Sequence, residues 1–160
     1  MTSRFLVRAA VYAALYAVLT LAPGLNALAY GQVQFRVSEA LLVFACFDPA
    51  AVLGLTAGTA IGNLGSPMMP VDVVAGAVLT LLAAALMYRI GPRVVALAVP
   101  VAVNGLGVAA MLALLLDLPY WASAAWVGIG EAVVMFTAGL ALLFAVRRHQ
   151  DLFGITRPAA

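Results

Sequence analysis

Long apolar stretches, each closed by a short polar or turn-forming segment, set the strongest limit on how this chain can fold. The stretches cover residues 5–22, 37–64, 71–88, 94–116 and 120–146. They make 66% of the chain hydrophobic and leave 9% charged, against about 45–50% and about 25% in soluble domains. A soluble core of this size cannot bury so much apolar surface. The pattern predicts a membrane protein and argues against a soluble enzyme or a nucleic-acid-binding protein.

The second stretch contains a break at Asp48-Pro49. This pair is typical of a helix start, because Asp caps a helix and Pro fits its first position. All eight basic residues are arginines, and a break here places seven on one side of the membrane and Arg36 alone on the other. An unbroken helix would put six of the eight outside. Because basic residues gather on the cytoplasmic side, we predict six helices with both termini cytoplasmic.

The predicted fold class is an all-α membrane protein, a six-transmembrane-helix bundle in a single integral membrane domain, residues 1–160. Helices 2 and 3 are shorter than the ~20 residues of a usual span, so we expect a tilted pair or a hairpin. Arg4, Arg8 and the segment Ala27-Leu28-Ala29 also have features of a signal peptide, but in a polytopic chain we expect the first helix to remain. The predicted helices cover about residues 5–22, 37–47, 49–64, 71–88, 94–116 and 120–146.

Nothing in the sequence indicates a metal site, a cofactor or an enzyme. Cys46 and His149 each occur once, without a metal-binding pattern around them. No HExxH, GxSxG or suitably spaced carboxylate pair is present. We therefore expect no catalytic residues and no bound metal.

Polar residues inside the apolar stretches are costly in lipid and indicate function. Glu131 lies near the middle of the last predicted helix, too far from its ends to be a cap, and Gly128 and Gly130 leave room beside it. Asn104 has the same position in the fifth helix, and its amide could bind a heterocyclic edge. Structural pairing between helices is the alternative for both residues.

Other candidates lie toward the predicted outer side. Gln34, Arg36 and Glu39 place an amide, a cation and a carboxylate at the entry to a short helix, although Arg36 and Glu39 could simply pair locally. Asp72 could bind a solute, or it could simply interact favourably with the dipole of its helix. The remaining candidates in the outer half are Asn63 and Trp126. Since the inner half is almost purely apolar, the distribution favours an outward-open solute pocket over an ion channel.

Several segments resemble the QueT family, predicted substrate-binding (S) components of energy-coupling factor (ECF) transporters for queuosine precursors. The resemblance covers nearly the whole chain, and its most specific string is Gln34-Phe35-Arg36-Val37-Ser38-Glu39-Ala40-Leu41. The other similar segments are Pro49–Asn63 with Gly54 and Gly58, Asp72–Thr80, Asn104-Gly105 and Gly130-Glu131.

The resemblance implies a multi-pass protein of a prokaryotic plasma membrane, which works with a transmembrane coupling protein and two cytoplasmic ATPase subunits. The implied ligand is a 7-deazaguanine such as queuine. A carboxylate can accept two N–H groups of a guanine-type edge, so Glu131 could bind it, with Asn104 or Gln34 at its carbonyl. An exocyclic ammonium would prefer Asp72 or Glu39, and Trp126 could stack on the ring.

Energy coupling points to partners as well. The chain has no Lys and hence no phosphate-binding GxxxxGK[ST] loop, so concentrative uptake would need another subunit or an ion gradient. In S components of this kind, small residues on the first helix receive the coupling protein. Ala9, Ala13 and Ala17 form such a stripe.

Two other functions remain open at this stage. The chain could be an S component for another vitamin-like nutrient, with the same fold. It could instead be a self-sufficient secondary transporter that uses Glu131 as a proton site. An intramembrane enzyme has no motif to support it.

Overall fold

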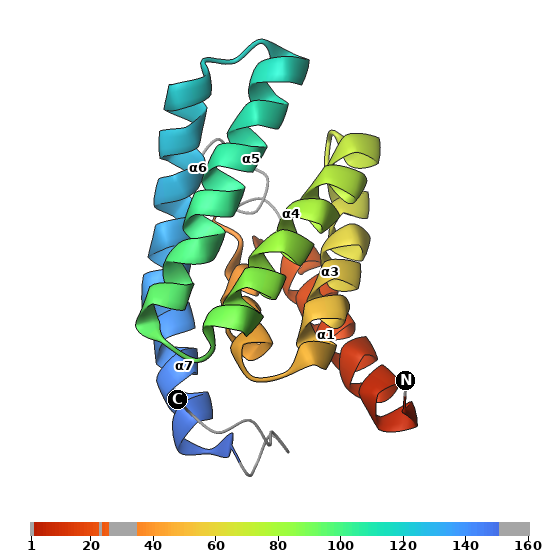
Figure 1. Cartoon of the computed structure of the whole chain (residues 1–160). Coiled ribbons are helices and arrows are strands. Elements are labelled where there is room, and N and C mark those ends of the chain that lie inside the picture. Colours follow the sequence, from red (N-terminus) through yellow and green to blue (C-terminus); the bar gives the residue numbers. More distant parts are fainter. Residues whose placement is uncertain (1, 23, 26–34, 151–160) are drawn as a thin grey trace.

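The computed structural model describes residues 2–22, 24–25 and 35–150. Within these ranges the chain passes through the bundle in six helical segments and forms no strand. Four segments are long and apolar enough to cross a membrane, namely Ser3–Leu21, Met69–Ile90, Val94–Leu116 and Tyr120–Arg148. The expected all-α membrane bundle is therefore confirmed (Figure 1).

The first long helix is α1 (Ser3–Leu21) and the second is α4 (Met69–Ile90). A short 3-10 turn, η3 (Val94–Leu97), leads into α5 (Ala98–Leu116). The last segment is interrupted: α6 (Tyr120–Val134) is followed by a π-helical turn, η4 (Met135–Gly139), and then by α7 (Leu140–Arg148).

The second and third segments are short, as predicted. The 3-10 helix η1 covers Val37–Cys46, and α3 covers Pro49–Gly62, followed by the turn η2 (Asn63–Gly65). Each is about 20 Å long at the usual rise per residue, less than the ~30 Å of a bilayer core. Asp48 begins α3 by accepting a hydrogen bond from the Ala50 N–H at 2.9 Å. The break at Asp48-Pro49 is thus where the chain reverses.

Packing on all sides holds η1 in its 3-10 form. Runs of 3-10 helix longer than three or four residues are uncommon, yet η1 has ten residues. It contacts α1, α3 and α4 as well as the last segment, and Leu42, Val43 and Ala45 are fully buried. The tight helix therefore forms in the centre of the bundle, where its neighbours restrict its width.

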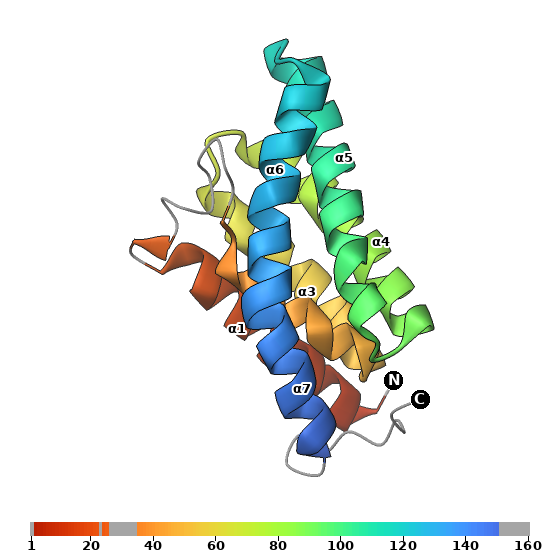
Figure 2. The same ribbon diagram turned by 90° about the vertical axis from the view of Figure 1, so that its left-hand side faces the viewer.

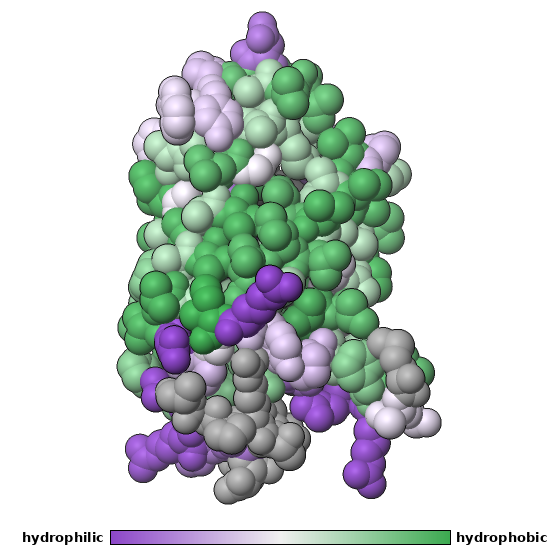
Figure 3. Space-filling model, in the orientation of Figure 1, coloured by the Kyte–Doolittle hydropathy of each residue, from purple (hydrophilic) through white to green (hydrophobic). Residues whose placement is uncertain are grey.

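The start of α1 and the end of α7 lie at the same end of the bundle (Figure 1). The α5–α6 turn extends beyond the other helices at the opposite end (Figure 2). Hydrophilic side chains gather near the termini, below a broad hydrophobic belt (Figure 3). The helix ends at the terminal end carry Arg4, Arg8, Arg89, Arg93, Arg147 and Arg148. Arg157 lies outside the described residues.

Helices α1 and α3 cross at very close range. A Cβ built on Gly58 would lie 2.7 Å from the Tyr16 Cβ and 2.8 Å from the Ala13 carbonyl oxygen, closer than real Cβ atoms come. Gly54 meets the backbone of Ala9 in the same way. Only glycine fits these two positions, and small residues are what close helix approach in a membrane requires.

This crossing changes the interpretation of the alanine stripe. The backbone of Ala9 and Ala13 is against α3, and Ala17 is buried. The stripe predicted to receive a coupling protein therefore packs largely within the chain, because the glycines of α3 face it. On α1 the exposed alanines are Ala10 and Ala14.

Candidate functional site

Four buried polar side chains from four elements meet inside the bundle. They are Tyr16 of α1, Glu39 of η1, Asn104 of α5 and Glu131 of α6, and we call them the polar cluster. The Asn104 amide nitrogen donates to Glu131 Oε1 at 2.8 Å and lies 3.5 Å from Glu39 Oε2. The Tyr16 hydroxyl donates to Glu39 Oε1. One amide thus links two carboxylates that are 65 and 27 residues from it in sequence.

Arg36 supplies the cation of the cluster. Its Nη1 lies 3.9 Å from Glu39 Oε1, and its side chain is 13% exposed. The local pair that was the alternative reading of these two residues is therefore present, but it also forms one wall of the cluster. The ion pair with Arg36 is compatible with a binding role for Glu39, because Glu39 also accepts a hydrogen bond from Tyr16 on a different helix.

Small residues position Asn104 between the two acids. A Cβ on Gly105 would lie 3.4 Å from the Gly128 Cα, so α5 and α6 approach closely at this level. Close approach brings short side chains on facing helices within hydrogen-bond distance. Gly105 thus allows the close approach of α5 to α6 that brings Asn104 to Glu131.

Further hydrogen bonds fix the elements around the cluster. The Thr20 and Ser38 hydroxyls are 2.7 Å apart and join α1 to η1. The Thr59 hydroxyl donates to Thr80 Oγ1 at 3.0 Å and joins α3 to α4. Both pairs are buried, which holds Glu39 and the wall beside it in place.

A small pocket of about 20 Å³ opens beside the cluster, and we call it the polar pocket. It is lined by Arg36, Glu39, Gly76, Leu79, Thr80, Asn104, Val108, Val127 and Glu131. A volume of ~10–15 Å³ holds one water molecule, whereas small-molecule sites usually have about 300–1,000 Å³. In this conformation the polar pocket has room for one water-sized group.

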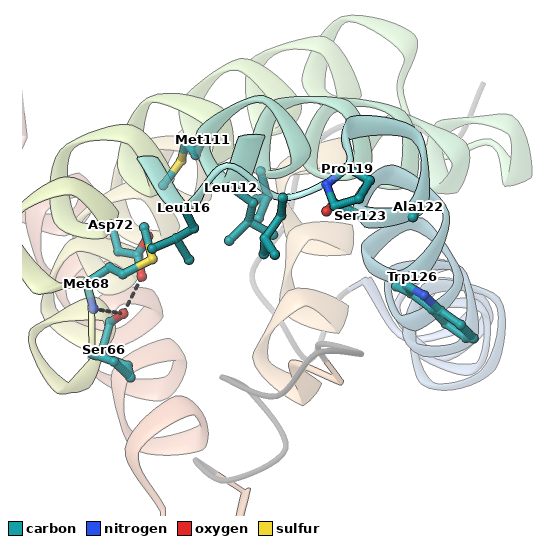
Figure 4. Close-up of a pocket in the computed structure, with 13 residues that line it drawn as sticks. Ser66, Met68, Asp72, Met111, Leu112, Leu116, Pro119, Ala122, Ser123 and Trp126 are labelled. Atoms are coloured by element: carbon teal, nitrogen blue, oxygen red, sulfur yellow. Dashed lines mark hydrogen bonds between the residues drawn. The ribbon is translucent and has the colours of Figure 1, made fainter. Parts of the chain in front are cut away.

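A second cavity of about 540 Å³ lies beside the α5–α6 turn, and we call it the wide cavity (Figure 4). It lies between α4, α5 and α6, with Val108 lining both spaces. Its lining includes Ser66, Met68, Asp72, Met111, Leu112, Leu116, Pro119, Ala122, Ser123 and Trp126. The two spaces follow the same three helices at successive depths.

The charges of the cluster do not balance. Glu39 and Glu131 contribute two carboxylates, and the guanidinium of Arg36 is the basic group that faces them among the described residues. Glu131 is 4% exposed, and Asn104 is the hydrogen-bond donor that the described part of the chain gives it. Burying such a charge is costly unless donors or cations compensate it. The arrangement suits a ligand rich in N–H donors.

Metal binding is not supported by the donor set. In the described ranges, no three His, Cys, Asp or Glu side chains come together as metal ligands. Glu39 and Glu131 are bridged by an amide N–H, which is a donor and would oppose a cation between them.

The structure brings together four of the residues singled out in the sequence: Arg36, Glu39, Asn104 and Glu131. Asp72 and Trp126 line the wide cavity instead.

Two of the sequence candidates lie elsewhere. Asn63 lines neither space. It is buried, and its amide donates to the Asp72 carbonyl at 2.6 Å, which ties the end of α3 to the start of α4. Gln34 lies outside the described residues.

Tyr16 is the cluster residue that sequence reasoning missed. Aromatic residues are common in an apolar helix, so a single Tyr carries little information. A signal was nevertheless present: Arg8, Tyr12, Tyr16 and Thr20 recur every four residues and so share one face of the helix. Three of them contact polar partners on η1 or at its end, through Asp48, Glu39 and Ser38.

Comparison with known proteins adds independent findings. The family model described as QueT transporter matches residues 6–148. The chain is 45% identical over 76 residues to a protein of Lactococcus lactis subsp. cremoris (strain MG1363), named as a queuosine precursor transporter. That alignment covers 48% of this chain and 44% of the relative, so it spans less than half of either protein. No solved structure matches the chain.

Proposed function

Because the chain belongs to the QueT transporter family, we propose that it binds a queuosine precursor, a 7-deazaguanine base such as queuine, as the S component of an ECF-type importer. The observation that carries this proposal is the buried cluster of Glu39, Asn104 and Glu131 below the wide cavity. The Lactococcus relative is named for the same class of substrate.

The chemistry of the cluster suits the edge of a guanine-type base. Such an edge presents two adjacent N–H groups, which one carboxylate can accept together. Glu131 has the capacity for this, because it accepts one hydrogen bond, from Asn104. The Asn104 N–H that now contacts Glu131 would turn to the carbonyl of the base, while the other N–H stays on Glu39. Glu39, held by Tyr16 and Arg36, keeps the amide oriented.

Binding requires the polar pocket to widen. Its volume of about 20 Å³ is too small for a bicyclic base, whereas the wide cavity above it measures about 540 Å³. The shared wall is apolar, with Val108 common to both spaces and Leu79 and Val127 beside it. We propose that the base enters through the wide cavity and displaces these side chains to reach Glu131.

The arginines support the direction of transport. Six of the described arginines lie in or beside the helix ends on the side where α1 begins and α7 ends, and the positive-inside rule puts that side in the cytoplasm. The wide cavity then opens toward the outside, as a site that captures substrate for uptake requires.

Energy would come from partner proteins. The chain has no phosphate-binding loop, and the family resemblance implies a coupling protein with two cytoplasmic ATPases. On α1, Ala10 and Ala14 are exposed, with Val7, Val11 and Val18 beside them. We propose this exposed face, in place of the Ala9–Ala13–Ala17 stripe, as the surface that receives the coupling protein.

A thermal-shift screen of the purified protein tests the substrate class. The panel contains queuine, its aminomethyl precursor, guanine and several vitamins. A ligand at 100 times its Kd stabilises a protein by ~2.7 kcal/mol, which gives a clear shift. We expect the deazaguanines to shift the melting temperature. A shift with a vitamin alone would support an S component for another nutrient and would refute this substrate.

Uptake into liposomes tests the source of energy. We expect uptake of queuine by this chain only when the coupling protein and ATPases are present with ATP. The alternative is a proton-coupled transporter, which the neighbouring acids Glu39 and Glu131 could serve. Uptake by the chain alone, driven by a pH gradient, would refute the S-component role.

A further inference from the structure

We propose that the wide cavity is a second subsite, which receives a positively charged side arm of the substrate and pairs it with Asp72. The proposal rests on the function proposed above, with the deazaguanine edge against Glu131. It adds that this protein selects ligands that carry an alkylammonium group on the base.

The two spaces are arranged in line, as one elongated ligand requires. On α4, Asp72 lines the wide cavity and Gly76 lines the polar pocket. On α6, Ser123 lines the wide cavity and Val127 lines the polar pocket. Four residues of helix rise ~6 Å, so the two levels are about one helical turn apart. A short substituent on a base bound at Glu131 would therefore enter the wide cavity.

Asp72 is held in place on the cavity wall. Its carboxylate accepts a hydrogen bond from the Ser66 hydroxyl, whose oxygen accepts from the Met68 N–H at 3.1 Å (Figure 4). The Asp72 carbonyl accepts from the Asn63 amide at 2.6 Å. Because hydrogen bonds hold both the side chain and the backbone of Asp72, its carboxylate loses less conformational entropy when it pairs with a ligand.

Asp72 faces the cavity without a basic neighbour. The residues that line the wide cavity include neither Arg nor His, and Asp72 forms no ion pair within the described part of the chain. The remaining walls are mostly apolar, with Met111, Leu112 and Trp126. This combination suits an arm with a hydrocarbon part and one cationic group.

The dipole of α4 alone could explain an acid in its first turn. It does not explain why the acid lines a cavity of about 540 Å³ directly above the cluster. The two roles predict different ligand preferences, so binding measurements separate them.

The test compares three ligands with the same ring system: 7-deazaguanine itself, its aminomethyl derivative and its nitrile derivative. Dissociation constants are measured by calorimetry for the unmodified protein, Asp72→Asn and Asp117→Asn. Asp117 is an acid in the α5–α6 turn that does not line the cavity. Asp117→Asn is therefore the matched control for general loss of negative charge at this end.

We expect the unmodified protein to prefer the aminomethyl compound over the nitrile by roughly fivefold, the upper end of what one partly exposed ion pair contributes. Asp72→Asn should remove this preference while changing nitrile binding by less than about twofold. Asp117→Asn should keep it. Equal binding of the two compounds by the unmodified protein, or a preference that persists in Asp72→Asn, would overturn the subsite.

Two further variants keep the test decisive. Ala122→Lys places a competing ammonium in the same cavity and should also remove the preference, even if Asp72→Asn fails to fold. Glu131→Gln should weaken all three compounds alike, because it acts on the shared ring. If none of the three binds the unmodified protein, the proposed function fails together with the subsite; if all bind equally, only the subsite fails.

Discussion

The Tyr16 hydroxyl donates a hydrogen bond to the Glu39 carboxylate inside the bundle. This contact joins α1 to η1 and connects the long first helix to the acid that also faces Asn104. The opposite face of α1 is the proposed docking surface. The position of α1 and the geometry of the polar cluster are therefore mechanically linked.

Removing this hydroxyl tests how far the cluster depends on it. Tyr16→Phe leaves a buried carboxylate with one donor fewer, which costs about 1–3 kcal/mol. We expect a lower melting temperature in detergent and weaker binding of queuine. Tyr120→Phe changes a tyrosine that packs edge-on against Trp121 at the start of α6, and its effect should stay within about 0.5 kcal/mol. Equal effects of the two variants would contradict a special role for Tyr16.

The α1–α3 crossing should tolerate no added side chain. Gly58→Ala would force a Cβ to within 2.8 Å of the Ala13 carbonyl oxygen, and overpacking of this kind costs about 1–3 kcal/mol. Gly128→Ala is the matched control, since a Cβ there meets nothing within 4 Å. Thermal unfolding should show a clear loss for the first variant and no loss for the second, since alanine favours a helix over glycine. Stable Gly58→Ala protein would mean that the helices are farther apart.

The buried charge of Glu131 should lower the stability of the ligand-free protein, although it serves ligand binding. It is buried near Glu39 and has no cation within 4 Å in the described residues. Glu131→Gln removes the charge but keeps the shape and the contact with Asn104. We expect the ligand-free variant to be more stable by about 1 kcal/mol, as for other buried charges at functional sites. A marked fall in its melting temperature would show that the charge is structural.

If the exposed face of α1 receives the coupling protein, a bulky side chain should have different effects on the exposed and the buried side of this helix. Ala14→Trp changes an exposed residue and should prevent copurification with the coupling protein, while queuine still binds. Ala17→Trp changes a residue that is 7% exposed and should disturb the fold and binding together. Normal assembly of the Ala14→Trp variant would remove this surface from consideration.

Much of the architecture could be predicted from local signals. Asp48-Pro49 and the placement of the arginines predicted six helical segments with a short second and third, and the structure has them. The 3-10 form of η1 and the π turn at Met135–Gly139 were not predicted. Both depend on how neighbouring helices pack, and hydrophobic pattern carries little of that information.

The candidate site was predictable residue by residue but not as an arrangement. An acid or amide in the middle of an apolar helix stands out, which is why the sequence singles out Asn104 and Glu131 as candidates. Their meeting with Glu39 depends on helix contacts across 65 residues of sequence. The role of Tyr16 and the contact of the Ala9–Ala13–Ala17 stripe with α3 were not predicted for the same reason, since a helix sequence alone does not say which face meets α3.

The most direct test of the proposed function is the dissociation constant of queuine for the purified protein and for Glu131→Gln. Loss of two charge-assisted hydrogen bonds costs about 1.5–3 kcal/mol each, so we expect the variant to bind at least roughly 100-fold more weakly. Its melting temperature, measured on the same samples, should not fall. Binding of queuine with equal affinity by both proteins would contradict the assignment of Glu131 as the centre of the site.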